Sequence, residues 1–336
     1  MNAGSHPFRR SASLLLLLAV VVPLHSQQPA DWKDPSGHVQ RFVPVSDTVR
    51  LEMLDWGGSG RPLVLLPGGG DTAHVFDEFA SKLTGDFHVY GITRRGFGES
   101  GFAPPASGGD TYGDDVLAVL DALKLERPVL VGHSIGGQEL SSVATRYPTR
   151  VAALVYLDAG YAYAFDNGTG PTIKEIQDLR APQPPPPTQA DVASFLALRQ
   201  YFLRVEGVAF PEAELRQQRP VNPDGRVGKP RDFPGYSMLL AGMKKYFDNR
   251  VPALVVFALP HGLGRWVDDS TDPQVRERAK AYTAALTRLT ARQAQIIEDG
   301  VPTARVVKLP GAHHYVFLSH EAEVIREMRA FLGRLP

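Results

Sequence analysis

The sequence contains no cysteine. Its absence excludes disulfide bonds, thiolate metal ligands, a cysteine nucleophile and a lipid-modified cysteine near the N-terminus. The chain also lacks an excess of either charge, because 36 lysine and arginine residues balance 36 aspartate and glutamate residues. A neutral chain has neither the basic footprint of a nucleic-acid-binding protein nor a polybasic membrane patch. We therefore predict no nucleic-acid partner.

Long apolar runs are also missing. The longest uninterrupted run, residues 14–22, is far shorter than the roughly 20 residues that span a bilayer. Arg9 and Arg10 precede this run, and small and polar residues follow it. A positive start, a short apolar stretch and a polar exit are typical of a secretory signal. We predict that residues 1–28 are a signal peptide and that the mature protein is secreted or periplasmic, without a stable membrane anchor after processing.

Short apolar runs recur along the remaining chain and alternate with helical patterns. Continuous runs typical of strands buried on both faces cover residues 62–66, 88–92, 128–131, 151–157, 251–259 and 304–309. Apolar residues at helical spacing cover residues 116–123, 140–147, 272–298 and 324–332. Two segments of alternating polarity, 41–45 and 49–54, precede them and predict half-buried antiparallel strands. Strands that alternate with helices predict an α/β fold, a mostly parallel sheet flanked by helices.

One segment departs from this alternation. Residues 160–250 contain no buried-strand run but have two helical patterns and a proline run, at 192–203, 236–247 and 184–187. We predict a mainly helical lid here, inserted after the sixth strand, with residues 29–159 and 251–336 forming the core. The alternative is a disordered linker between two domains. The aromatic and aliphatic residues of 195–203 argue against disorder.

The motif Gly132-His133-Ser134-Ile135-Gly136 matches G-x-S-x-G. A predicted strand enters it and a predicted helix leaves it near Gly137, so the glycines permit a sharp strand-to-helix turn that exposes the serine. At a helix N-terminus, backbone N–H groups stabilise negative charge. The alternative is a glycine-rich loop with an incidental serine. The strand-to-helix context favours Ser134 as a nucleophile.

In this order of elements the chain resembles the α/β-hydrolase superfamily. The two-strand start, the nucleophile turn, the inserted segment and a late histidine all follow the family order, and the resemblance covers nearly all of the chain after residue 28. It implies the fold, a Ser–acid–His mechanism and an oxyanion hole. The N–H groups of Gly69 and Ile135 are the implied oxyanion donors. Pro67 stands where the family usually has histidine, so the hydrogen bonding of that loop must differ.

The family places its catalytic histidine after the last buried strand, where this chain has His313 and His314. The family pattern, glycine and histidine followed by an aromatic residue, aligns on His314 as the base. The acid is expected either at Asp158, directly after a buried strand, or at Asp268 or Asp269, after the next one. We favour Asp158. Neither histidine belongs to a recognisable zinc spacing, so no metal and no cofactor are predicted.

These residues predict a serine hydrolase that cleaves a carboxylic ester of a small, apolar substrate through an acyl-enzyme. Hydrolysis of an amide, a lactone or a C–C bond, or perhydrolysis, would use the same triad. A non-catalytic small-molecule-binding protein is the alternative from another class. Aromatic residues of the predicted lid suggest an apolar pocket: Tyr161, Tyr163, Phe165 and Tyr236. We expect Phe195 and Tyr201 to influence substrate selectivity. No pattern indicates the oligomeric state.

Overall fold

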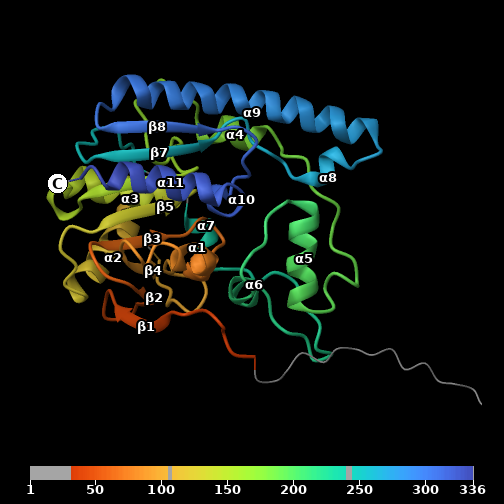
Figure 1. Cartoon of the computed structure of the whole chain (residues 1–336), viewed down its shortest axis with the longest axis horizontal. Helices are drawn as coiled ribbons and strands as arrows, with labels where there is room; N and C mark the ends of the chain where they lie inside the picture. The colour runs from red at the N-terminus through yellow and green to blue at the C-terminus, as the bar shows by residue number, and fades with distance from the viewer. Residues whose placement is uncertain (1–31, 105–107, 240–243, 336) are drawn as a thin grey trace, which may run out of the picture.

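The computed structural model describes residues 32–104, 108–239 and 244–335, and the predicted signal peptide lies outside them. Eight strands form one sheet in the order β1-β2-β4-β3-β5-β6-β7-β8 (Figure 1). The strands are β1 (Val39–Pro44), β2 (Arg50–Gly57), β3 (Pro62–Leu66), β4 (His88–Ile92), β5 (Val129–His133), β6 (Ala153–Leu157), β7 (Ala253–Ala258) and β8 (Ala304–Leu309). Pairing is antiparallel on both sides of β2 and parallel from β4 to β8. This confirms the predicted mostly parallel sheet.

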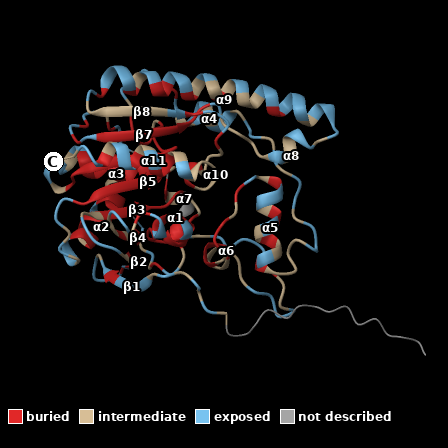
Figure 2. Cartoon of the chain, in the orientation of Figure 1, coloured by how far each residue is buried: buried red, intermediate tan, exposed pale blue. Residues whose placement is uncertain are grey.

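Both faces of the central strands are buried, which explains their continuous apolar sequences (Figure 2). In β3, Leu63 and Leu65 belong to one hydrophobic cluster, and Val64 and Leu66 belong to the other. The cluster that includes Val64 and Leu66 contains apolar residues of α2 (Asp110–Ala122), α3 (Gly136–Arg146) and α9 (Pro273–Gly300). The other contains those of α1 (Asp77–Ser81), α10 (Val316–Ser319) and α11 (Glu321–Leu332). The sheet is therefore covered by helices on both sides.

The segment between β6 and β7 is mainly helical or irregular. Its helices are α4 (Ile173–Asp178), α5 (Phe195–Val205), α6 (Glu212–Gln218) and α7 (Tyr236–Leu239). Within its described residues, β pairing is limited to an isolated bridge between Val221 and Val227. α5 and α6 lie to one side of the sheet (Figure 1). The inserted position agrees with the sequence, whereas its role as a lid stays a prediction.

The predicted helix over residues 236–247 forms only in part. α7 ends at Leu239 in the described chain, and residues 244–250 are not helical. Tyr246 instead donates its hydroxyl to Asp110 Oδ1 at 2.7 Å, and its carbonyl accepts from the N–H of Asp166. Contacts to the core therefore override the local helical pattern.

Within the described ranges, no helix combines the length and apolar content that a membrane span requires. The longest, α9, has a mixed sequence in which buried positions alternate with exposed polar ones. Its apolar side packs on the sheet and its other side is exposed (Figure 2).

Candidate functional site

Ser134 lies in a tight turn between β5 and α3. Its φ of 50° is left-handed, a conformation that is strained for a residue with a side chain. A Cβ atom at Gly136 would lie 2.7 Å from the carbonyl oxygen of Leu66, and one at Gly132 would lie 2.8 Å from the backbone of Gly136. The two glycines of the motif therefore allow the chain to turn, and Ser134 stands at the start of α3.

Asp158 stands beside Ser134 at the same edge of the sheet. The register of β5 and β6 pairs His133 with Leu157, so Ser134 and Asp158, the next residues after these strands, are neighbours. The Asp158 side chain is fully buried, and its Oδ2 lies 2.6 Å from Nδ1 of His314, in the loop after β8. Since Nδ1–H donates to this carboxylate, Nε2 of His314 remains free to accept a proton. The structure thus brings two of the predicted site residues into direct contact.

The carboxylate of Asp158 is also held by its other neighbours. Its Oδ1 accepts from the N–H of Ala258 at 3.0 Å and from the hydroxyl of Tyr161 at 3.0 Å. Burial alone would raise the pKa of Asp158, but His261 and His314 outweigh it and hold this pKa well below its ordinary value. Asp158 is therefore ionised and suited to orient an imidazole.

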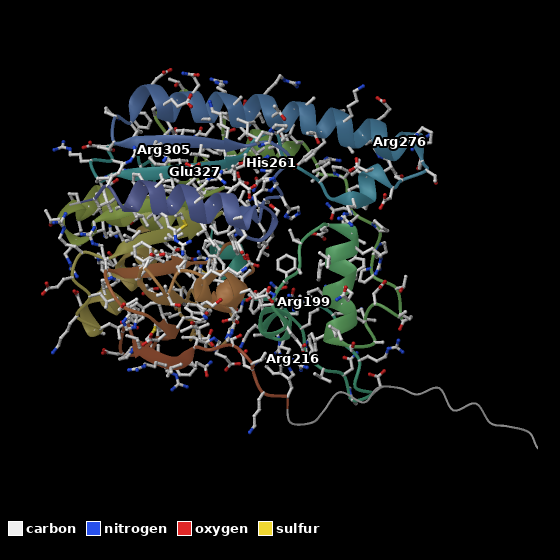
Figure 3. All side chains as sticks on the ribbon, in the orientation of Figure 1. Arg199, Arg216, His261, Arg276, Arg305 and Glu327 are labelled. Carbon is white, nitrogen blue, oxygen red and sulfur yellow. The ribbon has the colours of Figure 1, made fainter. Side chains whose placement is uncertain are left out.

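His261 is a site residue that the sequence patterns did not single out. It lies in the loop after β7 and below α9 in the view of Figure 3. Its Nε2 is 2.8 Å from Oδ2 of Asp158, the oxygen that His314 also contacts. Two imidazoles therefore share one carboxylate oxygen. The signal was its position: it follows a buried parallel strand, at the edge where functional residues of such sheets gather.

The alternative site residues lie elsewhere. His313 accepts from the N–H of Tyr315, and burial, followed by the influence of His314, lowers the pKa of His313 to about 4. Asp268 and Asp269 are exposed at the end of α8 (Arg265–Asp268). The geometry therefore favours His314 over His313 and Asp158 over the two later aspartates.

The predicted oxyanion residues, Gly69 and Ile135, line the same cavity as Ser134. Arg94 fixes the glycine loop by donating to the carbonyl of Pro67 at 2.7 Å and to that of Gly68 at 3.0 Å. Its guanidinium is in turn held by Glu139 of α3, with Nε 2.6 Å from Oε1. Arg94 thus supplies hydrogen-bond donors to a loop in which Pro67 has no donor of its own. The sequence patterns did not reveal this role.

The cavity at Ser134 has a volume of about 490 Å³. Its wall away from Ser134 and His314 is mostly apolar and aromatic, with Tyr161, Tyr163, Ile173, Ile176, Leu239, Tyr282 and Leu286. Tyr163 and Ser134 line the same cavity. No lysine or arginine is among the described residues that line it.

The other aromatic residues of the predicted pocket lie elsewhere or are undescribed. Phe165 packs against Tyr156 in the core, and the side chain of Tyr236 is not among those described. Phe195 and Tyr201, expected to affect selectivity, are buried in α5 and do not line the cavity.

The buried side chains of Asp71 and Glu214 lie close together beside the glycine loop, residues 68–70. Asp71 Oδ1 accepts from Tyr315 Oη at 3.1 Å and from Gln218 Nε2 at 3.2 Å. Glu214, from α6, accepts the N–H of Thr72 at 3.1 Å. Burial raises the pKa of Asp71 to about 6, and burial together with the charge of Asp71 raises the pKa of Glu214 to about 8.

Two groups of described residues have donor atoms close enough to share a metal ion. The first is Asp158 with His261 and His314, whose contacts the hydrogen bonds above already explain. The second, remote in sequence from the triad, consists of Asp34, His38, His74 and Asp77.

Residues 63–327 match the model of the alpha/beta hydrolase family. The 2-(acetamidomethylene)succinate hydrolase of Mesorhizobium japonicum is 26% identical over 77% of this chain and 83% of its own length. The bifunctional esterase/perhydrolase of Acinetobacter calcoaceticus is 32% identical over 34% of this chain and 43% of its own. The chain spans 37% and 44% of two further curated relatives that are 36% identical to it.

A solved structure agrees with the observed architecture. The crystal structure of E-2-(acetamidomethylene)succinate hydrolase superposes with a TM-score of 0.61 over 88% of this chain and 99% of that one, at 19% identity. This likeness concerns the fold alone. Together with the match to the family model over most of the sequence, it leads to one conclusion: the chain belongs to the α/β-hydrolase family.

Proposed function

We propose that the chain is a serine hydrolase that cleaves a carboxylic ester of a small, uncharged substrate. The observation that carries the proposal is the contact of 2.6 Å between His314 Nδ1 and the buried Asp158, beside the strained turn of Ser134. A nucleophile, a base and an orienting carboxylate at one sheet edge form the constellation that acyl transfer requires.

In the proposed reaction, Ser134 Oγ bonds to the carbonyl carbon of the ester while His314 Nε2 takes the Ser134 hydroxyl proton. The N–H groups of Gly69 and Ile135 donate to the resulting oxyanion, and the loss of one such donor typically costs about 2.7 to 4 kcal/mol. The C–O bond to the alcohol then breaks, and His314 returns the proton to the leaving oxygen. Water, activated by the same histidine, releases the acid from Ser134.

The cavity supports an uncharged substrate. The Mesorhizobium relative is named for a succinate derivative, and a carboxylate-bearing substrate needs a cation or several N–H donors. In this chain, the described cavity wall offers no lysine or arginine, and Asp71 is the only carboxylate that reaches it. Ile173, Ile176 and Leu286 offer apolar contacts instead.

Perhydrolysis is the second candidate, because the Acinetobacter relative is named an esterase and perhydrolase. The acyl-enzyme would be the same, and hydrogen peroxide would replace water as the attacking molecule. Amide, lactone or C–C bond hydrolysis would use the same residues, whereas an epoxide-opening enzyme would need a carboxylate in place of Ser134.

The test combines a fluorophosphonate probe with nitrophenyl esters of increasing acyl length. The native protein is expected to be labelled and to hydrolyse the esters, and Ser134→Ala is expected to abolish both. Ser81→Ala, which removes a surface hydroxyl on α1, is the matched control and should change neither. A native protein that resists the probe would be a binding protein. Peracid formation from acetate and peroxide would identify the second candidate.

We also propose that the protein is exported. The support is the charged and apolar pattern of residues 1–28, which lie outside the described residues. Intact-mass measurement on protein from its own host tests this proposal. The expected chain begins near residue 27, and a soluble protein that retains Met1 would contradict export.

A further inference from the structure

The second group of close donor atoms joins the N-terminal segment to the start of the first helix. Asp34 and His38 precede β1, His74 belongs to the short 3-10 helix η1 (Ala73–Phe76), and Asp77 opens α1. One donor atom from each of the four lies within 4.8 Å of the others. The side chains of His38, His74 and Asp77 are almost fully buried. Two imidazoles and the Asp77 carboxylate are thus buried in one place, with the partly exposed carboxylate of Asp34 beside them.

The distances fit ligands around a shared cation. Asp34 Oδ2 lies 3.6 Å from His38 Nε2 and 3.5 Å from His74 Nδ1, and His74 Nδ1 lies 3.3 Å from Asp77 Oδ2. Bonds of about 2.0 to 2.1 Å in a tetrahedron place neighbouring ligand atoms about 3.3 to 3.4 Å apart. Direct hydrogen bonds between an imidazolium and a carboxylate are shorter, about 2.7 to 2.9 Å.

A proton on His74 is the competing occupant. The carboxylates of Asp34, Asp77 and Glu52 surround His74 and would stabilise a proton on it. The contacts of His74 with all three carboxylates are nevertheless 3.3 Å or longer. This spacing is wider than charge-assisted hydrogen bonds prefer, which favours a cation between the groups.

His74 has the supporting contact of a metal-binding histidine. Its second nitrogen, Nε2, lies 3.3 Å from Oε1 of the buried Glu52. Glu52 is fixed by Gln40 Nε2 and by Thr93 Oγ1, each at 2.6 Å. Metal-ligating histidines almost always donate their other N–H to such a carboxylate, which sets the tautomer and the ring orientation. Here the arrangement leaves Nδ1 of His74 for the metal.

Asp77 is oriented in the same way. Its Oδ1 accepts from His38 Nδ1 at 2.8 Å and from Trp56 Nε1 at 3.1 Å. Asp77 Oδ2 and His38 Nε2 face the other members of the group, at 3.3 Å from His74 Nδ1 and 3.6 Å from Asp34 Oδ2. With neutral imidazoles, Asp34 and Asp77 would give a divalent ion two negative ligands, while Glu52 accepts the N–H of His74 Nε2.

A small cavity of about 120 Å³ gives access to the group, with Asp34 and His74 in its wall. Arg216 also lines it, but its guanidinium is paired with Glu212 at 2.6 Å and stacks over the ring of Trp32. Its charge is therefore compensated on its own helix, α6, and an ion can approach Asp34 and His74.

We propose that Asp34, His38, His74 and Asp77 bind one Zn²⁺ ion in a tetrahedral site. Two imidazoles and two carboxylate oxygens are ligands that zinc accepts, and four protein ligands indicate a structural rather than a catalytic site. The ion would fasten the N-terminal segment to η1 and α1, next to the loop that carries Gly69. The sequence prediction of no metal considered only His313 and His314, and the pairs Asp34-x-x-x-His38 and His74-x-x-Asp77 match no common zinc motif.

The test uses the full chain, dialysed against a chelator and then supplied with ZnCl₂. We expect one bound zinc per chain by elemental analysis and a rise in Tm on the order of 5 °C. His38→Gln and His74→Gln are expected to lose both effects. His88→Gln is the matched control, because His88 forms a comparable 2.9 Å contact with Asp55 outside this group, and it should keep the zinc.

The variants also locate the ion. His261→Gln removes a donor from the catalytic group and should still bind one zinc per chain. If that substitution abolishes zinc binding, the ion sits at the triad and the proposal is wrong. Native protein that binds no zinc and shows no change in Tm would overturn it as well, as would a His38→Gln variant that retains the ion. Should His74→Gln fail to fold, His38→Gln decides the question alone.

Discussion

Asp158 connects three loops at the edge of the sheet. Its carboxylate accepts hydrogen bonds from Ala258 at the end of β7, from His261 after β7 and from His314 after β8. The residue itself follows β6 with a left-handed φ of 46°. A fully buried carboxylate with four partners has little freedom to rotate. The orientation of His314 therefore depends on the packing of the sheet edge as a whole.

The acid assignment gives the prediction at the scale of single residues. Asp158→Asn is expected to lower kcat by about 10⁴, because the amide cannot hold the His314 tautomer or stabilise its imidazolium. Asp269→Asn, at the exposed end of α8, is the control and should stay within about tenfold. Steady-state kinetics on a nitrophenyl ester measure both. An active Asp158→Asn alongside an inactive Asp269→Asn would reassign the acid.

The position of Ser134, Asp158 and His314 at one sheet edge could be predicted because each follows a recognisable strand, and parallel strands place their carboxyl ends at one edge. His261 and Arg94 could not be assigned in this way. The partner of His261 is Asp158, 103 positions away, and Arg94 binds carbonyls 26 and 27 positions away. Local patterns do not encode such contacts, since they depend on the completed fold.

At the scale of elements, helix ends with local signals were predictable. The side chain of Asp272 accepts from the N–H of Gln274, and Pro273 occupies the first turn of α9, which begins close to residue 272, where the helical pattern of the sequence starts. The helix expected over 236–247 forms only over Tyr236–Leu239 in the described residues, and Tyr246 forms tertiary hydrogen bonds instead. Apolar periodicity predicted α2, α3 and α11, whose apolar residues pack on the sheet, but it did not reveal the tertiary contacts of Tyr246.

The inserted segment separates into parts with different roles. Ile173 and Ile176 of α4 line the cavity, whereas Phe195 and Tyr201 of α5 are buried in a hydrophobic cluster beside the sheet. The expectation that Phe195 and Tyr201 affect selectivity followed from their aromatic character, which serves packing here. Selectivity is instead expected to depend on α4.

Ile176→Trp is the test at this scale. The larger ring would occupy part of the 490 Å³ cavity and shorten the space for an acyl chain. Excluding only two methylenes costs about 1.6 kcal/mol, or roughly 15-fold in kcat/KM for a long ester relative to acetate. Leu196→Trp, at an exposed position of α5, should leave this ratio unchanged. Equal loss for short and long esters would indicate a folding role for Ile176.

At the scale of the whole molecule, polar contacts tie the inserted segment to the sheet domain. Arg199 of α5 pairs with Glu78 of α1 at 2.6 Å, and both residues are partly exposed (Figure 3). Exposed pairs of this kind contribute little, typically 0 to 1 kcal/mol. Glu214 of α6 is different, because it is fully buried against Thr72 and close to Asp71. We therefore expect the protonation state of Glu214 to affect the stability of this contact.

The raised pKa values of Asp71 and Glu214 determine how the stability of the folded protein changes with pH. Asp71 and Glu214 have pKa values raised to about 6 and about 8 in the folded protein, against about 3.9 and 4.3 for unperturbed groups. At a pH between the unperturbed pKa and the folded-state pKa of each group, the folded state binds more protons than the unfolded state. Stability is therefore greatest below about pH 4 for these two groups and decreases as pH rises through 6 and 8.

Glu214→Gln removes the titrating charge and keeps an oxygen that can accept from the N–H of Thr72. Below about pH 4, where Glu214 is protonated in the folded and the unfolded states alike, the Tm curves of the variant and the native protein should run parallel. Between about pH 4 and pH 8 the native Tm is expected to decrease more steeply, because the unfolded state has released the Glu214 proton that the folded state still holds. Thermal unfolding at constant ionic strength measures both curves. Glu126→Gln, an exposed change, should follow the native curve, and parallel curves for Glu214→Gln would show that this carboxyl does not titrate in that range.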